Sequence, residues 1–116
     1  MIEPILIKFL SAKLGLTVTA EKQTGEVTGP AVVIDKTGSS ESNHISMATV
    51  AIQSYDVSKL KASMLNDRVK AAMRTIAEEV TEVTSCSLNS DYSYMNTVTK
   101  EYRYQAVYDL VYYEEE

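Results

Sequence analysis

Cysteine and histidine each occur once in this chain of 116 residues, as Cys86 and His44. One cysteine cannot form an internal disulfide, which fits a reducing cytoplasm. The histidine has no HxH or HxxxH companion, so a three-ligand zinc site is disfavoured. Cys86 lies in the alternating stretch "TSCSL", where a small buried apolar group is favoured over a nucleophile. We therefore expect no metal site and no cofactor.

Several other signatures are missing. No apolar run approaches the roughly 18 residues of a membrane-spanning helix, and "MIEPILIKFL" lacks the basic leader of a secretion signal. There is no Gly-x-Ser-x-Gly elbow, no phosphate-binding glycine loop and no distinctive acidic pair. We expect no membrane partner, no catalytic residue and no enzyme activity. A small hydrolase that uses His44 with Cys86 or Ser85 is the rival interpretation.

Basic residues are also few. The chain has 11 Lys and Arg against 16 Asp and Glu, a formal net charge of -5. The acidic excess lies in residues 83–116, the same segment that carries seven of the eight tyrosines. Because nucleic-acid binders need a basic surface, specific nucleic-acid binding is disfavoured.

The hydrophobic spacing predicts two helices. Residues 1–15 carry an amphipathic stripe that Gly15 is placed to end, and residues 56–80 carry a second one. The first stripe consists of Ile2, Ile5, Leu6, Phe9, Leu10 and Leu14. The second consists of Val57, Leu60, Met64, Leu65, Val69, Ala72, Met73, Ile76 and Val80. We expect both helices to pack on a sheet.

Strands are predicted at residues 16–21, 30–36, 44–55, 82–90 and 99–113. The third has apolar residues on both parities, which predicts a bulge or burial on both sides. The order α-β-β-β-α-β-β predicts one α+β domain over residues 1–116, with a mostly antiparallel sheet. Residues 22–29, 37–43 and 91–98 are expected to be loops. Those expected to form mobile contacts include Gly25, Gly29, Gly38, Ser39, Ser40 and Asn43.

The tyrosines of the last strand share one face. Tyr102, Tyr104, Tyr108 and Tyr112 have the same parity, whereas Arg103 lies with Glu101, Gln105 and Asp109 on the other. The stripe can form the hydrophobic layer beneath the helices. Alternatively, some tyrosines, especially those in "DYSYMN", contact another subunit.

The segments "MIEPILIKFLSAKLG", "VVIDKTGSS", "ATVAIQSYDVSKLKASMLNDRVKAAM" and "NSDYSYMNTVTKEYRYQAVYDLVYY" occur in this order along almost the whole chain. In this colinear pattern the chain resembles the tail-terminator, or tail-completion, proteins of long-tailed bacteriophages and prophages of Gram-positive bacteria. The stretch "EKQTGEVTGPAVV" departs from the family pattern, which is shorter and richer in proline here. Head-to-tail joining proteins have a similar fold.

The resemblance implies a virion protein, made in the host cytoplasm, that forms a ring, commonly of six subunits, at the head-proximal end of the tail. Its partners would be further copies of itself, the major tail tube protein and the head–tail connector. DNA would pass through the lumen without specific binding, because acidic residues repel it. Another connector component or a prophage-encoded adaptor remains an alternative.

A ring subunit needs two different, complementary surfaces. One candidate is the expected aromatic loop of Asp91, Tyr92, Tyr94 and Met95. Its expected complement is the basic surface of the second helix. That surface consists of Lys59, Lys61, Arg68, Lys70 and Arg74.

Overall fold

The structure, a computed structural model, describes residues 1–21, 27–96 and 101–113. Within these ranges the chain forms three helices and five strands, so the predicted α+β class and order of elements are confirmed. The elements are α1 (Ile2–Leu14), β1 (Val18–Thr19), β2 (Ala31–Ser42), β3 (Ile45–Asp56), α2 (Lys59–Met73), α3 (Ile76–Glu79), β4 (Val83–Asn96) and β5 (Glu101–Tyr113).

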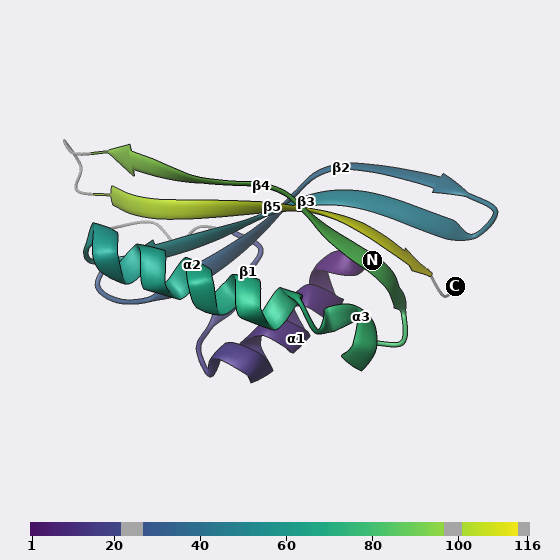
Figure 1. The fold of residues 1–116 in the computed structure, drawn as a ribbon, viewed down its shortest axis with the longest axis horizontal. Helices are drawn as coiled ribbons and strands as arrows, with labels where there is room; N and C mark the ends of the chain where they lie inside the picture. The colour runs from purple at the N-terminus through teal and green to yellow at the C-terminus, as the bar shows by residue number, and fades with distance from the viewer. Residues whose placement is uncertain (22–26, 97–100, 114–116) are drawn as a thin grey trace.

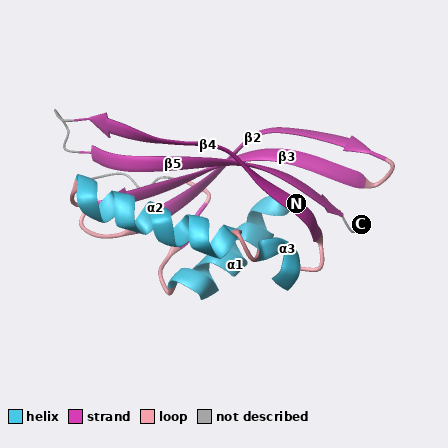
Figure 2. Cartoon of the chain, in the orientation of Figure 1, coloured by secondary structure: helices cyan, strands magenta, loops and turns pink. Residues whose placement is uncertain are grey.

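The strands form one sheet in the order β1-β2-β3-β5-β4 (Figure 1). All neighbours are antiparallel except β1 and β2, which are parallel. The helices lie on one side of the sheet, and no helix of the described ranges covers the other side (Figure 2). The β2–β3 hairpin projects past the helices at one end of the long axis, and α2 begins at the opposite end.

The first helix forms as predicted. Ile2, Leu6 and Leu10 are fully buried on its inner side. Gly15 ends the helix with φ of 68°, and its N–H donates to the carbonyl of Ser11. A residue with a side chain is strained in this left-handed conformation, whereas glycine is not.

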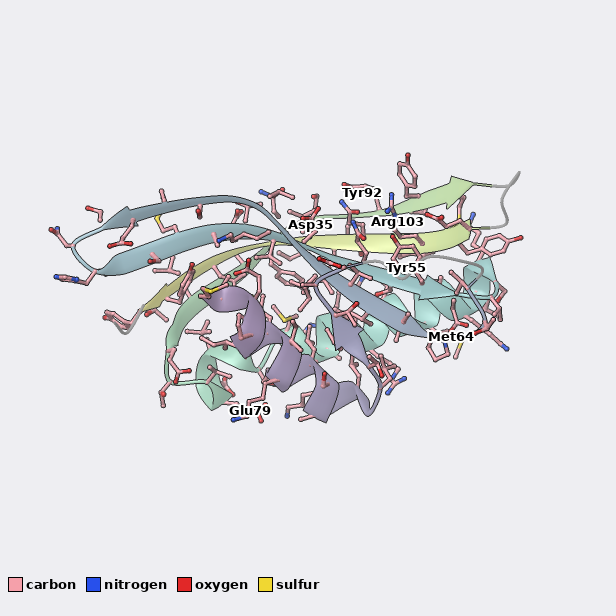
Figure 3. The ribbon with its side chains drawn as sticks, turned by 180° about the vertical axis from the view of Figure 1, so that it is seen from behind. Asp35, Tyr55, Met64, Glu79, Tyr92 and Arg103 are labelled. Carbon is pink, nitrogen blue, oxygen red and sulfur yellow. The ribbon has the colours of Figure 1, made fainter. Side chains whose placement is uncertain are left out.

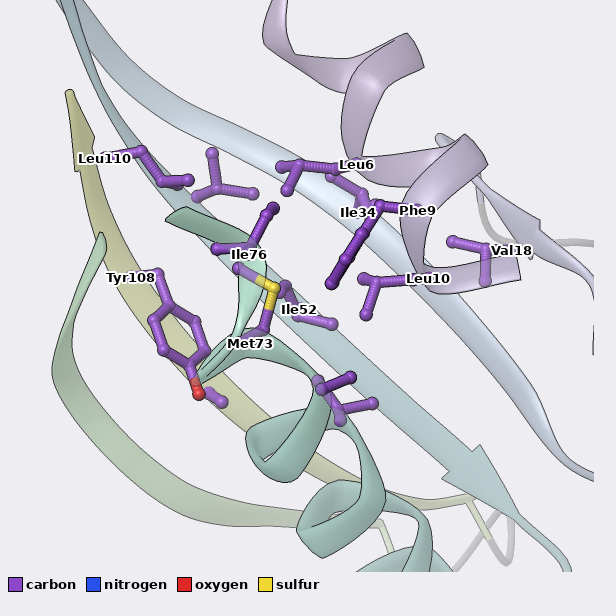
Figure 4. Close-up of a cluster of buried hydrophobic side chains, with 14 of the residues drawn as sticks. Leu6, Phe9, Leu10, Val18, Ile34, Ile52, Met73, Ile76, Tyr108 and Leu110 are labelled. Carbon is purple, nitrogen blue, oxygen red and sulfur yellow. The ribbon is translucent and has the colours of Figure 1, made fainter. Parts of the chain in front are cut away.

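The core fills the space between the helices and the sheet (Figure 4). Ile34 and Ile52 enter it from the sheet, and Met73 and Ile76 enter from α2 and α3. Tyr108 and Tyr112 belong to the same cluster. For these two tyrosines the expected hydrophobic layer beneath the helices is confirmed.

The predicted second helix is divided and rotated. Ser58 caps α2 by accepting from the N–H of Lys61, so Val57 precedes the helix, and α2 ends at Met73. Leu60 and Met64 were expected in the core but are 70% and 58% exposed, and Val57 is exposed as well. The buried positions include Ala62 and Asn66 instead.

Two polar contacts accompany this rotation. Asn66 Nδ2 donates to Asp91 of β4 at 2.8 Å, and Arg68 donates to the carbonyl of Leu14 at 2.6 Å. These contacts turn the Asn66 side of the helix toward β4 and join the helix to α1. The predicted stripe was therefore wrong for Val57, Leu60 and Met64.

The loop expected at residues 37–43 is mostly strand. The β2 strand continues to Ser42 and pairs with β3, so only Asn43 and His44 form the turn. Both have positive φ, 52° and 66°, as two-residue hairpin turns require. Pairing with the apolar β3 strand outweighs the loop-forming composition of "TGSSES".

The third strand is buried on both sides near its middle, at Val50, Ala51 and Ile52. Of the two alternatives for this strand, burial on both sides is correct. The register shifts occur in β2, between Lys36 and Gly38, and in β4.

The "DYSYMN" segment is also strand, so the loop prediction for residues 91–96 was wrong. Asp91 lies opposite Ala106 and Tyr94 opposite Arg103, in the antiparallel pairing of β4 with β5. Continuous pairing to Glu101 satisfies the backbone groups that face β5, in a segment whose Asp, Ser and Asn content favours turns.

Candidate assembly interface

The side of the sheet opposite the helices is here called the open face. Strand alternation places there the residues that do not enter the core. Its part nearest the start of α2 combines tyrosine, glutamine and arginine from three adjacent strands. These residues are Gln53 and Tyr55 of β3, Arg103 and Gln105 of β5, and Tyr92 and Tyr94 of β4.

Hydrogen bonds join these side chains across the sheet. Tyr55 donates its hydroxyl to Gln53 at 3.0 Å and accepts from Arg103 at 2.9 Å. Gln53 Nε2 donates to Gln105 Oε1 at 3.2 Å, and Gln105 Nε2 donates to the Tyr92 hydroxyl at 2.6 Å. The network fixes the side chains of an exposed surface before any partner binds.

Arg103 lies between aromatic rings. Its guanidinium carbon is 4.1 Å from the centre of the Tyr94 ring and 5.7 Å from that of Tyr55, both within cation–π range. Tyr55 is 2% exposed, whereas Tyr92 and Tyr94 are 44% and 54% exposed. Figure 3 shows Tyr55, Tyr92 and Arg103 together on the side of the sheet away from the helices.

A second polar cluster lies further along the open face. Asp109 accepts from Thr49 at 2.8 Å and from Asn89 at 2.9 Å. These bonds lower the pKa of the Asp109 carboxyl, because they stabilise its charged form, and the bond from Asn89 has the larger effect. Thr49 and Asp109 also line a shallow groove of about 340 Å³ between β2, β3 and β5.

The structure brings part of the predicted acidic surface and its predicted basic complement together within one chain. Lys70 Nζ lies 2.6 Å from one Asp91 oxygen, and Asn66 donates to the other. The hydrogen bond to Asp91 raises the pKa of Lys70. Asp91 and Lys70 therefore stabilise the packing of β4 on α2.

The remaining predicted interface residues are distributed as follows. Arg68 is bonded to α1, and Met95 is half-buried. Lys59 and Lys61 are exposed on α2, and Arg74 is exposed directly after its end. Together with Tyr92 and Tyr94 they are accessible to a partner.

The residues predicted to lie in contact loops are found in different kinds of structure. Gly38, Ser39 and Ser40 belong to β2, so they are not loop residues, and Asn43 forms the turn. Gly29 lies in the connection that precedes β2.

Gly25 lies outside the described residues. Gly38, Ser39, Ser40 and Asn43 are exposed on the β2–β3 hairpin, although the strand backbone is paired.

Exposed apolar side chains gather at both ends of the long axis. At the β2–β3 hairpin, Ile45, Met47 and Tyr113 form the hairpin-end surface, with 39%, 50% and 51% exposure. Leu60 and Met64 lie one turn apart at the start of α2 and form the α2-end surface. Figure 3 labels Met64. The helical periodicity of Leu60 and Met64 matched that of core residues, so their exposure could not be predicted from the sequence pattern.

The rival catalytic residues lie on different elements. His44 is exposed in the β2–β3 turn, whereas Cys86 is half-buried in β4, where burial raises its pKa to about 11. Such a thiol is a weak nucleophile at neutral pH. Among the described residues, no three His, Cys, Asp or Glu side chains are grouped as metal ligands.

No helix in the described ranges is long and apolar enough to span a membrane. No protein-family model matches the chain, and no curated protein sequence matches it. Support for a function therefore comes from the arrangement of the residues and from the colinear resemblance described above.

Proposed function

We propose that this chain is a phage virion protein that forms a ring, commonly a hexamer, at the head-proximal end of the tail tube. There it stops tube polymerisation and joins the tail to the head connector. Its partners are other copies of itself, the major tail tube protein and the connector. It acts as a structural component of the virion and not as an enzyme.

One observation carries this proposal: the subunit has two different exposed apolar surfaces at opposite ends. The described chain measures 46 × 24 × 23 Å, and the hairpin-end and α2-end surfaces lie at the two ends of its long axis. A head-to-tail ring repeats a contact between two unlike surfaces, whereas a two-fold dimer uses one surface twice.

Two further features support the proposal. The order of the four quoted segments follows the tail-terminator pattern. The net charge of -5 also suits a subunit around a DNA channel, because an acidic wall repels the phosphate backbone.

The test is a deletion of this gene in the phage or prophage genome that carries it, followed by electron microscopy. We expect overlong tails without heads, and recovery when the wild-type chain is supplied from a plasmid. Tails of normal length that fail to attach to heads would assign the neighbouring connector position instead. Unchanged virions would contradict both positions.

The same complementation separates the structural role from the hydrolase interpretation. The double variant His44→Ala, Cys86→Ala is expected to restore normal virions, because neither side chain is needed for a ring contact in this proposal. A variant that is folded by circular dichroism yet fails to restore infectivity would favour the enzyme.

A further inference from the structure

Arg103 is a cation without an acidic partner in the described part of the chain. The ion pairs there involve Lys13, Lys36 and Lys70, and no carboxylate lies within salt-bridge distance of the Arg103 guanidinium. One terminal nitrogen donates to Tyr55, and Nε is buried without a hydrogen-bond partner. Because a guanidinium has five N–H donors, most of its donor capacity is unused by the described residues.

The surroundings of Arg103 suit a carboxylate ligand. Stacking on Tyr94 and the bond to Tyr55 hold the guanidinium plane, so little freedom is lost when a second group binds. Planar guanidinium groups bind carboxylates through two parallel hydrogen bonds. The exposed rings of Tyr92 and Tyr94 would flank such a group and reduce its contact with water.

The chain itself contains a matching segment, Glu114, Glu115 and Glu116, directly after β5. We propose that this acidic segment of one copy binds the tyrosine-flanked Arg103 of a second copy. The charges are complementary, since three consecutive carboxylates meet a cation that lacks a described acidic partner.

The geometry requires a second copy. Arg103 and Tyr113 lie toward opposite ends of β5, about 33 Å apart in an extended strand of this length. Residues 114–116 reach at most about 11 Å beyond Tyr113 when fully extended. The acidic segment of one chain therefore cannot reach Arg103 of the same chain.

The contact joins unlike surfaces and so deepens the proposed function, on which it rests for closure into a ring. One copy offers the end of β5 beside the hairpin-end surface, and the next copy offers Arg103 near the α2-end surface. Since each copy carries both, the contact repeats head to tail. The affinity of this contact should weaken with added salt, because the acidic segment is charged and Arg103 lies at the surface.

The direct test uses a fluorescently labelled peptide, VYYEEE, corresponding to residues 111–116. The receptor is the chain with residues 114–116 deleted, which leaves its Arg103 unoccupied by other copies. We expect saturable binding by fluorescence anisotropy. Binding should weaken about tenfold or more with the receptor variant Arg103→Gln, and similarly with the peptide VYYQQQ.

Matched controls identify the role of the site. Lys8→Gln removes an exposed cation from α1, which is not part of the proposed contact, and is expected to leave peptide binding unchanged. Arg103→Lys keeps the charge but loses the planar fork, so binding should be intermediate. Equal binding by wild type and Arg103→Gln, with both folded by circular dichroism, would overturn the proposal.

A charge exchange tests the contact in the full chain. Neither the variant Arg103→Glu nor the variant with Glu114→Lys, Glu115→Lys and Glu116→Lys should associate alone through this contact. Their mixture should associate, because it restores both an inverted pair and an original pair of the acidic segment with Arg103, as measured by native mass spectrometry at low salt. Absence of mixed species, together with absence of peptide binding, contradicts the contact.

The two proposals can fail separately. If peptide binding depends on Arg103 but the gene deletion leaves tail length unchanged, the contact stands and the tail-terminator function is wrong. If the deletion gives overlong tails while Arg103→Gln affects neither peptide binding nor complementation, the function stands and this contact is wrong.

Discussion

The two faces of the sheet use tyrosine in different ways. On the helix-covered face, Tyr108 and Tyr112 are 5% and 2% exposed and contribute ring area to the core. On the open face, Tyr92 and Tyr94 remain accessible beside Arg103, and the Tyr92 hydroxyl is hydrogen bonded. The covered face therefore stabilises the subunit by removing apolar area from water, whereas the open face holds polar groups in place for recognition.

The largest expected difference between the faces is at apolar side chains. Leu110→Ala, at a side chain 1% exposed, should lower the free energy of unfolding by about 3 kcal/mol, because it leaves a cavity in the core. Met47→Ala on the open face, at a side chain 50% exposed, should change it by less than about 0.5 kcal/mol. Urea titrations followed by circular dichroism measure both, and equal losses would contradict the division between the faces.

The next comparison concerns aspartate. Asp91→Ala should lower the free energy of unfolding by about 2 kcal/mol. The reason is that the amide of Asn66, which is 2% exposed, loses its hydrogen-bond acceptor. Asp109→Ala on the open face should cost less, since Thr49 and Asn89 can exchange their bonds for water.

The pH dependence of Asp91→Ala follows from Lys70. The pKa of Lys70 is raised above 10.5 in the folded chain, mainly by its hydrogen bond to Asp91. The stabilisation by this pair is therefore complete below pH 10.5 and is lost as the pH rises through the folded value. Urea titrations should therefore show that the difference in free energy of unfolding between wild type and Asp91→Ala becomes smaller over that pH range. A constant difference would argue against the ion pair.

A smaller effect is expected from removing single hydroxyl groups. Tyr55→Phe should lower the free energy of unfolding by about 1 kcal/mol, because the hydroxyl is hydrogen bonded to both Gln53 and Arg103. Tyr108→Phe should cost less, since the Tyr108 hydroxyl makes no hydrogen bond within the described residues. Thermal unfolding compares the two, and a greater loss for Tyr108→Phe would show that the open-face network is not held together as described.

The smallest expected effect is on thiol reactivity. Burial against the core raises the pKa of Cys86 from 9.0 to about 11, so the folded chain should react slowly with iodoacetamide near pH 9. The alkylation rate of the folded chain should rise toward pH 11. The rate of the urea-unfolded chain should instead follow the ordinary thiol pKa of 9.0. Because the folded state retains the thiol proton, this group favours unfolding as the pH rises from 9.0 through about 11. A folded-state profile centred at 9.0 would show that Cys86 is solvated.

The sequence predicted the elements best where local periodicity and burial agree. Residues Ile2 to Gly15 formed the expected helix, because its apolar spacing and left-handed cap are local signals. The rotation of α2 could not be predicted in this way. Asn66 is polar, yet it is buried because Asp91 accepts its amide from a distant strand. Periodicity could not distinguish Leu60 and Met64 from core residues, since exposure depends on which neighbours lie above the helix.

The candidate site was only partly predictable. Tyr92 and Tyr94 were recognised as interface candidates from their aromatic character, and they are exposed. The hydrogen bonds among Gln53, Gln105 and Tyr92 depend on the register of three strands, which single-strand alternation does not specify. Arg103 was placed on the correct face but not singled out. Its position between tyrosines on β5 was the available signal.

The strand order also has a consequence for how the chain folds. The β2–β3 hairpin closes through two residues and β4–β5 through a short connection, so both pairs join neighbours in sequence. The central β3–β5 ladder instead joins segments separated by roughly half the chain, with α2 between them. Closing so long a loop loses more chain entropy than closing a hairpin. We therefore expect the two hairpins to form early and their joining through β3 and β5 to limit the folding rate.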